Sequence, residues 1–378
     1  MQMFTLERNL YTELHTAKME NLVYQVLGIK KHKALTWSVI FSSFFLFSCS
    51  EIVKTTSSHV EIYGETQGTT YSIILAEKGV PITKKQIDSI FTAFDLSLST
   101  YVEGSVISQI NRSESNFNIL DKNHFYRECY QLSQDIYSKT DGFFDPSVFP
   151  LVKGWGFMNH MDSPLSKNEV DSILTFVSFE KERFHQVEFK DDSIFFEKSN
   201  PNFKIDFNAI AQGQSVDVVA DYLKSKGYSN FYVEVGGELK VSGFNREGVK
   251  WKIGIDSPKE NLEHRELENI LHLTNASIAT SGNYRKFYVK DGVKYTHSLN
   301  PKTGFPVHHS LLSVTVIAED CATADGYATS FMVMGKEATL SFVENHPEEK
   351  LEVYLLSAAE NDSIDREMSV GFSQYLQE

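Results

Sequence analysis

Two oxygen-bearing side chains near the C-terminal end of the chain have a spacing that suits cation binding. Asp325 and Thr329 lie four residues apart in the segment ADGYATSFMVMG. Because residues four apart share one face of an α-helix, both side chains would project in the same direction. Mg²⁺ prefers one or two carboxylates together with the oxygens of a bound phosphate. Composition alone favours another interpretation, in which Asp325 is a solvated or capping acid near a helix start.

A second segment with chemical potential is DFNAIAQGQSVD, at residues 206–217, which leads from an extended stretch into the start of a helix. Unpaired N–H groups and the positive end of the helix dipole meet at such a start, and together they attract anions. The segment therefore predicts contacts with a phosphate or an adenine. It also fits a capped helix that follows a strand, and the two interpretations are compatible.

A third candidate is His297, which ends a predicted strand directly before an NPxTG turn in YTHSLNPKTGFPV, with Leu299 and Asn300 just after it. An imidazole can accept a proton at neutral pH, so His297 is a candidate general base. The alternative is a structural histidine that is hydrogen-bonded to the turn.

Composition limits the class of protein. The chain has 378 residues, of which 41% are hydrophobic and 13% aromatic, enough for one large core or two smaller ones. Its formal net charge of −14 argues against nucleic-acid binding, which requires many Lys and Arg side chains to neutralise phosphates. The three cysteines, Cys49, Cys129 and Cys321, are too few and too scattered for a disulfide framework or a zinc site.

The N-terminal region predicts export and lipid attachment. Basic residues at 30–33 precede about fifteen mostly apolar residues, a length typical of a signal peptide and short for a membrane-spanning helix. The segment ends in LFSC, which resembles a bacterial lipobox, so the thiol of Cys49 would carry a lipid. An uncleaved signal anchor is the alternative. We therefore divide the chain into an extension with a basic n-region (1–33), a lipoprotein signal peptide (34–49), a tether (50–59) and one folded domain (60–378).

The folded domain must place the candidate residues with a mixture of strands and helices. An alternating pattern with β-branched residues indicates a strand at 60–76, and apolar residues at helical spacing predict helices at 83–101 and 124–140. Grouped hairpins with helices between them favour an α+β fold of mainly antiparallel sheets, and neither a Walker loop nor a GxGxxG motif is present. The other predicted elements are a hairpin at 185–198 turned by Asp191-Asp192, a helix at 210–227 ended by Gly227, strands at 230–244, 249–255, 286–300 and 311–318, and a last long helix from 321 to 345 closed by His346-Pro347.

Eight segments together resemble the ApbE family of FAD:protein FMN transferases. They occur in the family's order and cover essentially all of the folded domain, which makes a chance match implausible. The resemblance implies a single α+β domain related to the T-fold. The segments are GETQGTTYSI, STYVEGSVISQIN, DGFFDPSVFPLVKGWGF, DFNAIAQGQSVD, VEVGGEL, ATSGNY, YTHSLNPKTGFPV and SVTVIAEDCATADGYATSFMVMG.

The resemblance also implies a reaction and the residues that support it. In the family, a Thr or Ser hydroxyl of a target protein attacks the FMN phosphorus of FAD with the help of magnesium, and AMP leaves. By resemblance the metal ligands are Asp325, Thr329 and the backbone carbonyl of Ala209. Gln212 departs from the lysine or acid often found at its position, which removes a charge beside the ligand. The implied FAD-binding residues are Gln67, Tyr101, Phe143, Phe144, Asp145, Asp206, Gln212 and Leu299.

Several functions share these residue types. A hydrolase that splits FAD into FMN and AMP would use the same metal and phosphate site, and a non-catalytic FAD-binding lipoprotein would lack part of the Asp325, Thr329 and His297 set, which is complete here. A solute-binding lipoprotein would show two lobes of alternating strands and helices, and this pattern does not. The resemblance further implies an exported acceptor protein with a flavinylation motif, such as a subunit of an electron-transfer system. It also implies a periplasm-facing enzyme that is anchored to the membrane by its lipid.

Overall fold

The computed structural model describes residues 60–157, 164–180, 182–258, 266–283, 287–290, 293–360 and 363–376. Residues Thr56–Glu378 form one compact unit. The predictions for residues 1–59, including lipid attachment at Cys49, lie outside the described residues. Within the described ranges, no helix is both long enough and apolar enough to cross a membrane.

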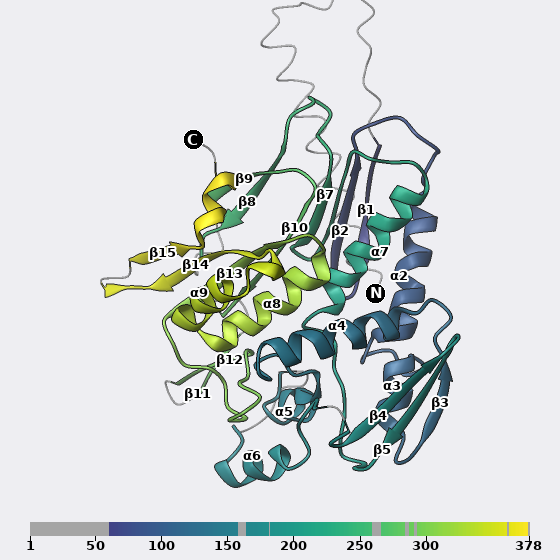
Figure 1. Cartoon of the computed structure of the whole chain (residues 1–378), viewed down its shortest axis with the longest axis vertical. Coiled ribbons are helices and arrows are strands. Elements are labelled where there is room, and N and C mark those ends of the chain that lie inside the picture. The colour runs from purple at the N-terminus through teal and green to yellow at the C-terminus, as the bar shows by residue number, and fades with distance from the viewer. Residues whose placement is uncertain are drawn as a thin grey trace, which may run out of the picture. The chain divides into compact units, whose positions relative to one another are not determined.

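A large antiparallel sheet forms the centre of the compact unit (Figure 1). Each pair of neighbouring strands in it is antiparallel, which confirms the predicted α+β class. In order across the sheet, the strands are β1 (Val60–Thr66), β2 (Thr69–Leu75), β6 (Phe231–Val235), β7 (Glu238–Ser242), β10 (Ala276–Gly282), β13 (Leu311–Ala318), β14 (Glu352–Ala358) and β15 (Ile364–Met368).

Three smaller antiparallel sheets surround it. Asp191 and Asp192 join β4 to β5, which confirms the predicted hairpin turn. The segment predicted as one strand at 286–300 instead holds two antiparallel strands, β11 and β12. The strands of the small sheets are β3 (Phe117–Leu120), β4 (His185–Lys190) and β5 (Ser193–Lys198), then β8 (Trp251–Asp256) and β9 (Leu267–Leu273), then β11 (Phe287–Lys290) and β12 (Val293–Thr296).

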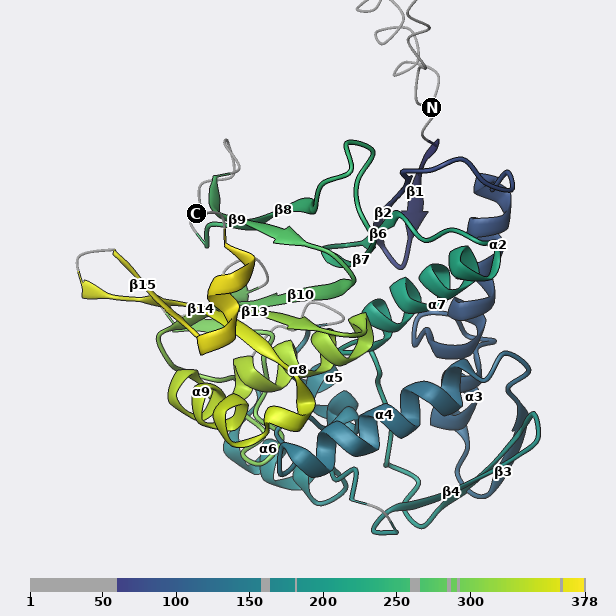
Figure 2. The same cartoon turned by 45° about the horizontal axis from the view of Figure 1, so that its top comes forward.

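Helices α7 and α8 pack against the large sheet, α7 on β6 and β7 and α8 on β10 and β13 (Figure 2). The helices predicted at 83–101, 124–140 and 210–227 are confirmed as the slightly shorter α2, α4 and α7, and Gly227 takes the left-handed conformation that ends α7 (φ 88°). The helices are α2 (Lys84–Leu98), α3 (Val106–Arg112), α4 (Phe125–Lys139), α5 (Phe149–Gly154), α6 (Lys167–Leu174), α7 (Ala211–Ser225), α8 (Cys321–Met334) and α9 (Lys336–Asn345), with 3₁₀ turns at η1 (Pro146–Val148), η2 (Pro347–Glu349) and η4 (Val370–Tyr375).

Two further sequence predictions were wrong. The last long helix is two helices, because Gly335 has φ 84° and ψ 173°, a conformation that stops α8 and from which α9 restarts. The single strand predicted at 60–76 is a hairpin, because Gln67 (φ 52°) and Gly68 (φ 73°) form a two-residue turn between the paired Thr66 and Thr69. This turn brings Gln67 to the edge of the candidate site.

Burial of apolar side chains fixes α7 on the sheet. Its inward face carries four buried apolar residues at helical spacing, which pack with buried residues of β2 and β6. The first turn of α7 is thereby held over the ends of β6 and β7. The inward-facing residues are Val216, Val219, Ala220 and Leu223.

Candidate functional site

The site is built where the first turn of α7 meets α8. The backbone N–H of Gly213 donates a hydrogen bond to Oδ2 of Asp325, with an N–O distance of 3.0 Å. A Cβ on Gly213 would lie 2.3 Å from the carbonyl oxygen of Cys321, so only glycine lets the two helices come this close. The close approach therefore presents the Asp325 carboxylate to the helix start that the sequence marked as an anion site.

Asp217, one turn further along α7, fixes the start of α8. Its Oδ2 accepts hydrogen bonds from the backbone N–H groups of Cys321 (2.8 Å) and Ala322 (2.9 Å). Its Oδ1 pairs with Nζ of Lys240 on β7 at 2.7 Å. The carboxylate thus satisfies N–H groups that a helix start leaves unpaired, and it joins α7, α8 and β7.

The environment of Asp325 suits a bound cation. Its side chain is buried, and burial raises its pKa to about 7, an effect that the hydrogen bond from Gly213 opposes. No Lys or Arg within the described ranges forms a salt bridge with it. A buried carboxylate without a cationic side chain becomes favourable when a metal ion supplies the missing charge.

The other predicted metal ligands are Thr329, on α8, and Ala209, two residues before α7. Thr329 follows Asp325 by one turn of α8, and its Oγ1 is 3.4 Å from Oγ of Ser281 on β10. The residue after Ala209, Ile210, packs against α8. Its Cδ1 would lie 3.4 Å from a Cβ placed on Gly326 of that helix. Within the described ranges, no three His, Cys, Asp or Glu side chains gather as a metal cluster. A metal here would therefore take hydroxyl, carbonyl and phosphate oxygens beside the one carboxylate.

Asp206 shapes the loop before α7. Its carboxylate accepts the backbone N–H (2.7 Å) and the side-chain amide (3.1 Å) of Asn208, and its own N–H donates to the carbonyl of Pro146 (2.8 Å). Burial raises its pKa to about 6. The pKa of Tyr101 is also raised, first by burial and then by the charge of Asp206. Tyr101 is nevertheless 71% exposed, which leaves its ring accessible to a planar ligand.

Two hairpin turns border the start of α7. Oε1 of Gln67, in the β1–β2 turn, accepts a hydrogen bond from Ser215 at 3.5 Å, and its buried Nε2 has no partner among the described residues. Gln212 donates through Nε2 to the carbonyl of Val235 at 2.9 Å and lies against Gly236. Gln67 thus holds an unused buried donor that a ligand could satisfy, whereas the Gln212 amide nitrogen is engaged with the protein.

The Phe143-Phe144-Asp145 triplet has three different environments. Phe143 is half-buried, with Nζ of Lys302 4.2 Å from its ring centre. Phe144 is buried in the main core. Asp145 accepts hydrogen bonds from the N–H and hydroxyl of Ser147 and from the N–H of Phe179, and burial raises its pKa to about 6. Of the three side chains, Phe143 is the one placed at the surface.

A polar path along β10 connects the His297 loop to α8. His297 is half-buried and follows the last residue of β12. The hydroxyl of the next residue, Ser298, donates to Oδ1 of Asn283 at 2.6 Å. Asn283 lies just beyond the end of β10, two residues after Ser281, which contacts Thr329. The strand therefore places the His297 loop at the same end as the α8 oxygen ligands.

The turn after His297 is held by hydrogen bonds to a side chain. Oδ1 of Asn300 accepts the N–H groups of Lys302 (2.9 Å) and Thr303 (3.3 Å). Leu299 is buried in a small core with Trp155, and its backbone pairs with Pro306. A contact of Leu299 with a ligand would therefore come from its backbone.

Comparison with known proteins agrees with this geometry. The family model described as "ApbE family" matches residues 67–355. The chain belongs to the ApbE family. A FAD:protein FMN transferase of Vibrio cholerae is 33% identical over 322 residues, which cover 82% of this chain and 90% of that relative.

Solved structures of other ApbE proteins have the same fold. The flavin transferase ApbE from Vibrio cholerae superposes with a TM-score of 0.72 at 32% identity, covering 84% of this chain and 99% of that chain. The apo form of the Pseudomonas stutzeri flavinyl transferase ApbE also gives a TM-score of 0.72, at 26% identity, covering 84% of this chain and 96% of that one.

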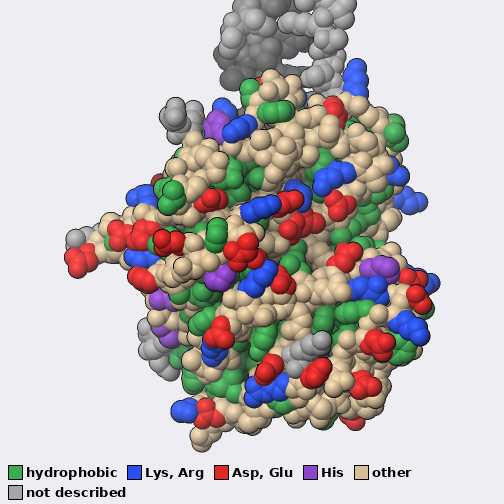
Figure 3. Space-filling model, in the orientation of Figure 1, with side chains coloured by type: hydrophobic (Ala, Val, Ile, Leu, Met, Phe, Trp, Pro, Cys, Tyr) green, Lys and Arg blue, Asp and Glu red, His purple; other side chains and the backbone are tan. Residues whose placement is uncertain are grey.

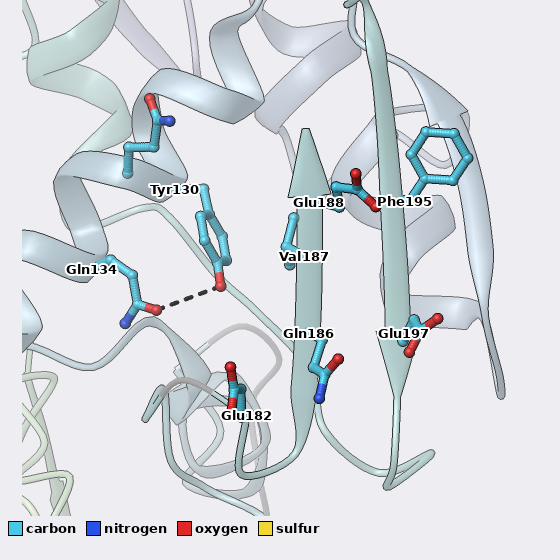
Figure 4. Close-up of a pocket in the computed structure, with 9 residues that line it drawn as sticks. Tyr130, Gln134, Glu182, Gln186, Val187, Glu188, Phe195 and Glu197 are labelled. Atoms are coloured by element: carbon cyan, nitrogen blue, oxygen red, sulfur yellow. Dashed lines mark hydrogen bonds between the residues drawn. The ribbon is translucent and has the colours of Figure 1, made fainter. Parts of the chain in front are cut away.

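A hollow of about 410 Å³ lies away from this ApbE site, between α4 and the β4–β5 hairpin (Figure 4). The hydroxyl of Tyr130 points toward Gln134 there, and Glu182 and Glu188 lie around it. None of the residues predicted from the sequence lines this hollow. The hollow therefore does not coincide with the candidate site between α7 and α8.

Sequence reasoning missed four residues that build the site: Gly213, Asp217, Ser281 and Asn283. Gly213 carried a usable signal, because glycine inside a predicted helix costs about 1 kcal/mol relative to alanine and often marks a close packing contact. Asp217 had none, since an acid in the second turn of a helix is common. Ser281 on β10 and Asn283 just beyond it contact Thr329 and Ser298, which only the fold brings near them.

Proposed function

We propose that this chain is a FAD:protein FMN transferase, which moves the FMN part of FAD onto a Thr or Ser hydroxyl of another protein. Membership of the ApbE family supports this, as do relatives of that name at 28–33% identity over most of the chain. The observation that carries the proposal is the buried Asp325 carboxylate held by the N–H of Gly213 at the start of α7.

The site residues divide the work of phosphoryl transfer, which depends mainly on positioning and charge neutralisation. The N–H groups at the start of α7 and the unused donor of Gln67 would hold the phosphates, and Tyr101 and Phe143 would contact the flavin ring. His297 would accept the proton of the acceptor hydroxyl. The hydroxyl oxygen forms a bond to the FMN phosphorus as the bond from that phosphorus to the AMP oxygen breaks, and AMP leaves.

Mg²⁺ is the metal we propose for the site, with Asp325, Thr329 and the carbonyl of Ala209 as its protein ligands. When bound, Mg²⁺ would neutralise the phosphate charge. The fit rests on the buried, unpaired carboxylate and on the hard oxygen character of all three groups.

We further propose that the protein is a periplasm-facing lipoprotein, attached through Cys49, and that its acceptor is an exported electron-transfer subunit with a flavinylation motif. The apolar segment at 34–48 and the LFSC sequence support export and lipid attachment. Mass spectrometry of tryptic peptides from the membrane fraction tests this: a diacylglyceryl group on Cys49 is expected, and an unmodified peptide spanning 34–54 would contradict it.

The transferase activity is tested by incubating the full chain in detergent with FAD, Mg²⁺ and a Thr-containing acceptor domain, followed by intact-mass measurement. We expect the acceptor to gain the mass of FMN, and EDTA to prevent that gain. Release of FMN and AMP with an unmodified acceptor would instead assign the site to a FAD hydrolase. Unchanged FAD, with an acceptor that a known ApbE transferase modifies in parallel, would contradict both activities.

A further inference from the structure

One end of the large sheet gathers exposed apolar side chains at the point where the fold begins. Antiparallel pairing puts Val60, the first residue of β1, opposite Leu75 at the end of β2, and Leu75 opposite Phe231 at the start of β6. The loops at 76–83 and 243–250 project from the same end, as both cartoon views show (Figures 1 and 2). We call this end the β1-start face.

Hydrogen bonds hold the two loops in place. The carbonyl of Asn230 accepts the N–H of Ala76 (3.0 Å), and its side-chain oxygen accepts the N–H of Phe244 (2.9 Å). The hydroxyl of Tyr228 donates to the carbonyl of Val80 at 2.9 Å. The face is therefore a built surface that displays side chains at fixed positions.

Its apolar side chains are far more exposed than a core residue would be. The exposed fractions are 58% for Val80, 47% for Phe244, 46% for Val249 and 38% for Val60. Exposed apolar side chains gathered on one surface indicate a contact with an apolar partner.

Exposed basic side chains outnumber exposed acidic ones at this end, although the whole chain carries a net charge of −14. The space-filling view shows hydrophobic and basic side chains close together at this end (Figure 3). The end of α7 and the loop at 226–230 lead into β6 at this same end. In residues 60–61, 76–83, 221–230 and 243–250, the exposed acids are Glu61, Asp221 and Glu247, Glu77 is half-buried, and the exposed bases are Lys78, Lys224, Lys226, Arg246 and Lys250. Apolar side chains together with an excess of Lys and Arg are the pattern that binds the interface of an anionic bilayer.

The chain outside the fold points to the same partner. The apolar segment at 34–48 and Cys49 precede Val60 by a tether of ten residues, 50–59. Fully extended, ten residues span at most about 36 Å. Whether a lipid on Cys49 or the apolar segment itself enters the membrane, the β1-start face begins within that distance of it.

We propose that the β1-start face lies against an anionic lipid bilayer, with Val80, Phe244 and Val249 in the interfacial region and the nearby Lys and Arg side chains on lipid phosphates. This inference rests on the proposed membrane anchor and is independent of the flavin chemistry.

The orientation has a consequence for access to the site. The turns at 67–68 and 236–237, which border the candidate site, lie at the opposite ends of β1 and β6 from this face. A strand of seven residues is about 23 Å long. Contact of the β1-start face with lipid therefore leaves the site open on the side away from the bilayer, where an acceptor protein can reach it.

Fluorescence quenching on vesicles tests the orientation. The full chain would be reconstituted in phosphatidylethanolamine–phosphatidylglycerol vesicles with a nitroxide on the lipid headgroup, and a fluorophore would be attached through Val80→Cys or, as the control, Leu120→Cys. These residues are 58% and 55% exposed, and Leu120 lies on β3, far from this face in Figures 1 and 2. Cys129 and Cys321 are buried, and the unsubstituted chain reports any labelling of Cys49.

We expect at least threefold more quenching at position 80 than at position 120. Adding the substitutions Phe244→Ser and Val249→Ser to the Val80→Cys chain should reduce that difference. Equal quenching in a chain that floats with the vesicles would overturn the inference and leave the anchor standing. A chain that does not float would overturn the anchor and this face together. In a further measurement without vesicles, the label at position 80 could become less accessible to a soluble quencher as the protein concentration rises. That result would assign the face to a second copy of the chain and overturn the lipid contact.

Discussion

Asp325 is a buried acid at the junction of α7 and α8. Its carboxylate is buried, accepts the N–H of Gly213, and forms no ion pair with the described Lys and Arg residues. Such a group is costly to keep charged unless a ligand compensates it. A carboxylate at this buried position is therefore better explained by ligand binding than by a contribution to the stability of the fold.

Asp325→Asn tests that role without changing the size of the side chain. The amide oxygen can still accept the Gly213 N–H, so the melting temperature should stay within about 3 °C of the original. The charge needed for Mg²⁺ is lost, so FMN transfer should fall at least about a hundredfold. Intact-mass kinetics and calorimetry measure the two effects. Asp135→Asn, at an exposed position on α4, serves as the control, and unchanged transfer by the Asp325 variant would disprove the metal assignment.

His297→Gln separates proton transfer from ligand binding. If His297 is the general base, the transfer rate should fall by about 10² to 10⁴ while the FAD dissociation constant stays within about twofold. Single-turnover mass spectrometry gives the rate, and flavin fluorescence gives the affinity. The control is His124→Gln, because His124 pairs with Asp192 at the surface. A weakened FAD affinity with an unchanged rate would show that His297 positions the ligand instead.

At the scale of the elements, the site depends on how closely α7 approaches α8. Gly213 permits the approach, and Asp217 caps the start of α8 from the second turn of α7. The two residues lie one helical turn apart, so they fix both the spacing and the axial position of the helices. The orientation of Asp325 follows from this junction.

Gly213→Ala should separate the helices. The new methyl group would meet the backbone of Cys321, which cannot rotate away, so we expect a loss of about 1 to 3 kcal/mol in the free energy of unfolding. The Asp325 hydrogen bond would lengthen, and the Mg²⁺ concentration needed for half-maximal transfer should rise. Urea unfolding and a Mg²⁺ titration measure these effects. Gly104→Ala is the control, since a Cβ there meets no atom within 4 Å.

The Asp217–Lys240 pair can be tested with a double-mutant cycle. Asp217→Ala should destabilise the fold by about 3 kcal/mol, because it leaves Lys240 partly buried without its partner and removes the cap of α8. Lys240→Met in the Asp217→Ala background should recover part of that loss. Unfolding in urea gives all four free energies, and purely additive effects would show that the pair is not coupled.

For the whole molecule, local patterns predicted most elements and some of the site. Periodicity located α2, α4 and α7, and the spacing of Asp325 and Thr329 correctly put both on α8. Gly335 divided the last helix because a glycine's backbone angles are not encoded in apolar spacing. Phe143 and Phe144 were indistinguishable as neighbours in the sequence, yet one is at the surface and the other in the core. Contacts such as Thr329 with Ser281 depend on sheet order, which no local pattern contains.

The stability of the whole fold should also depend on Lys198, a lysine with little solvent exposure at the end of β5. Its Nζ donates to the carbonyls of Asn111 (3.4 Å) and Ser113 (2.9 Å) near the end of α3. Burial, and secondarily the charge of Lys204, lower its pKa to about 7. Between about pH 7 and pH 10, the unfolded chain therefore binds a proton at this lysine that the folded chain does not.

It follows that the contribution of Lys198 to the free energy of unfolding rises with pH across this window. Lys198→Met removes that contribution, so its free energy of unfolding should change less between pH 7.5 and 9.5 than that of the original chain. Urea unfolding at several pH values measures the difference, and Lys190→Met, at an exposed position on β4, should leave the pH dependence unchanged. Equal pH dependence in the Lys198 variant and the original chain would mean that the carbonyls of Asn111 and Ser113 keep the ammonium group charged in the folded protein, and that hydrogen bonding outweighs burial at the end of α3.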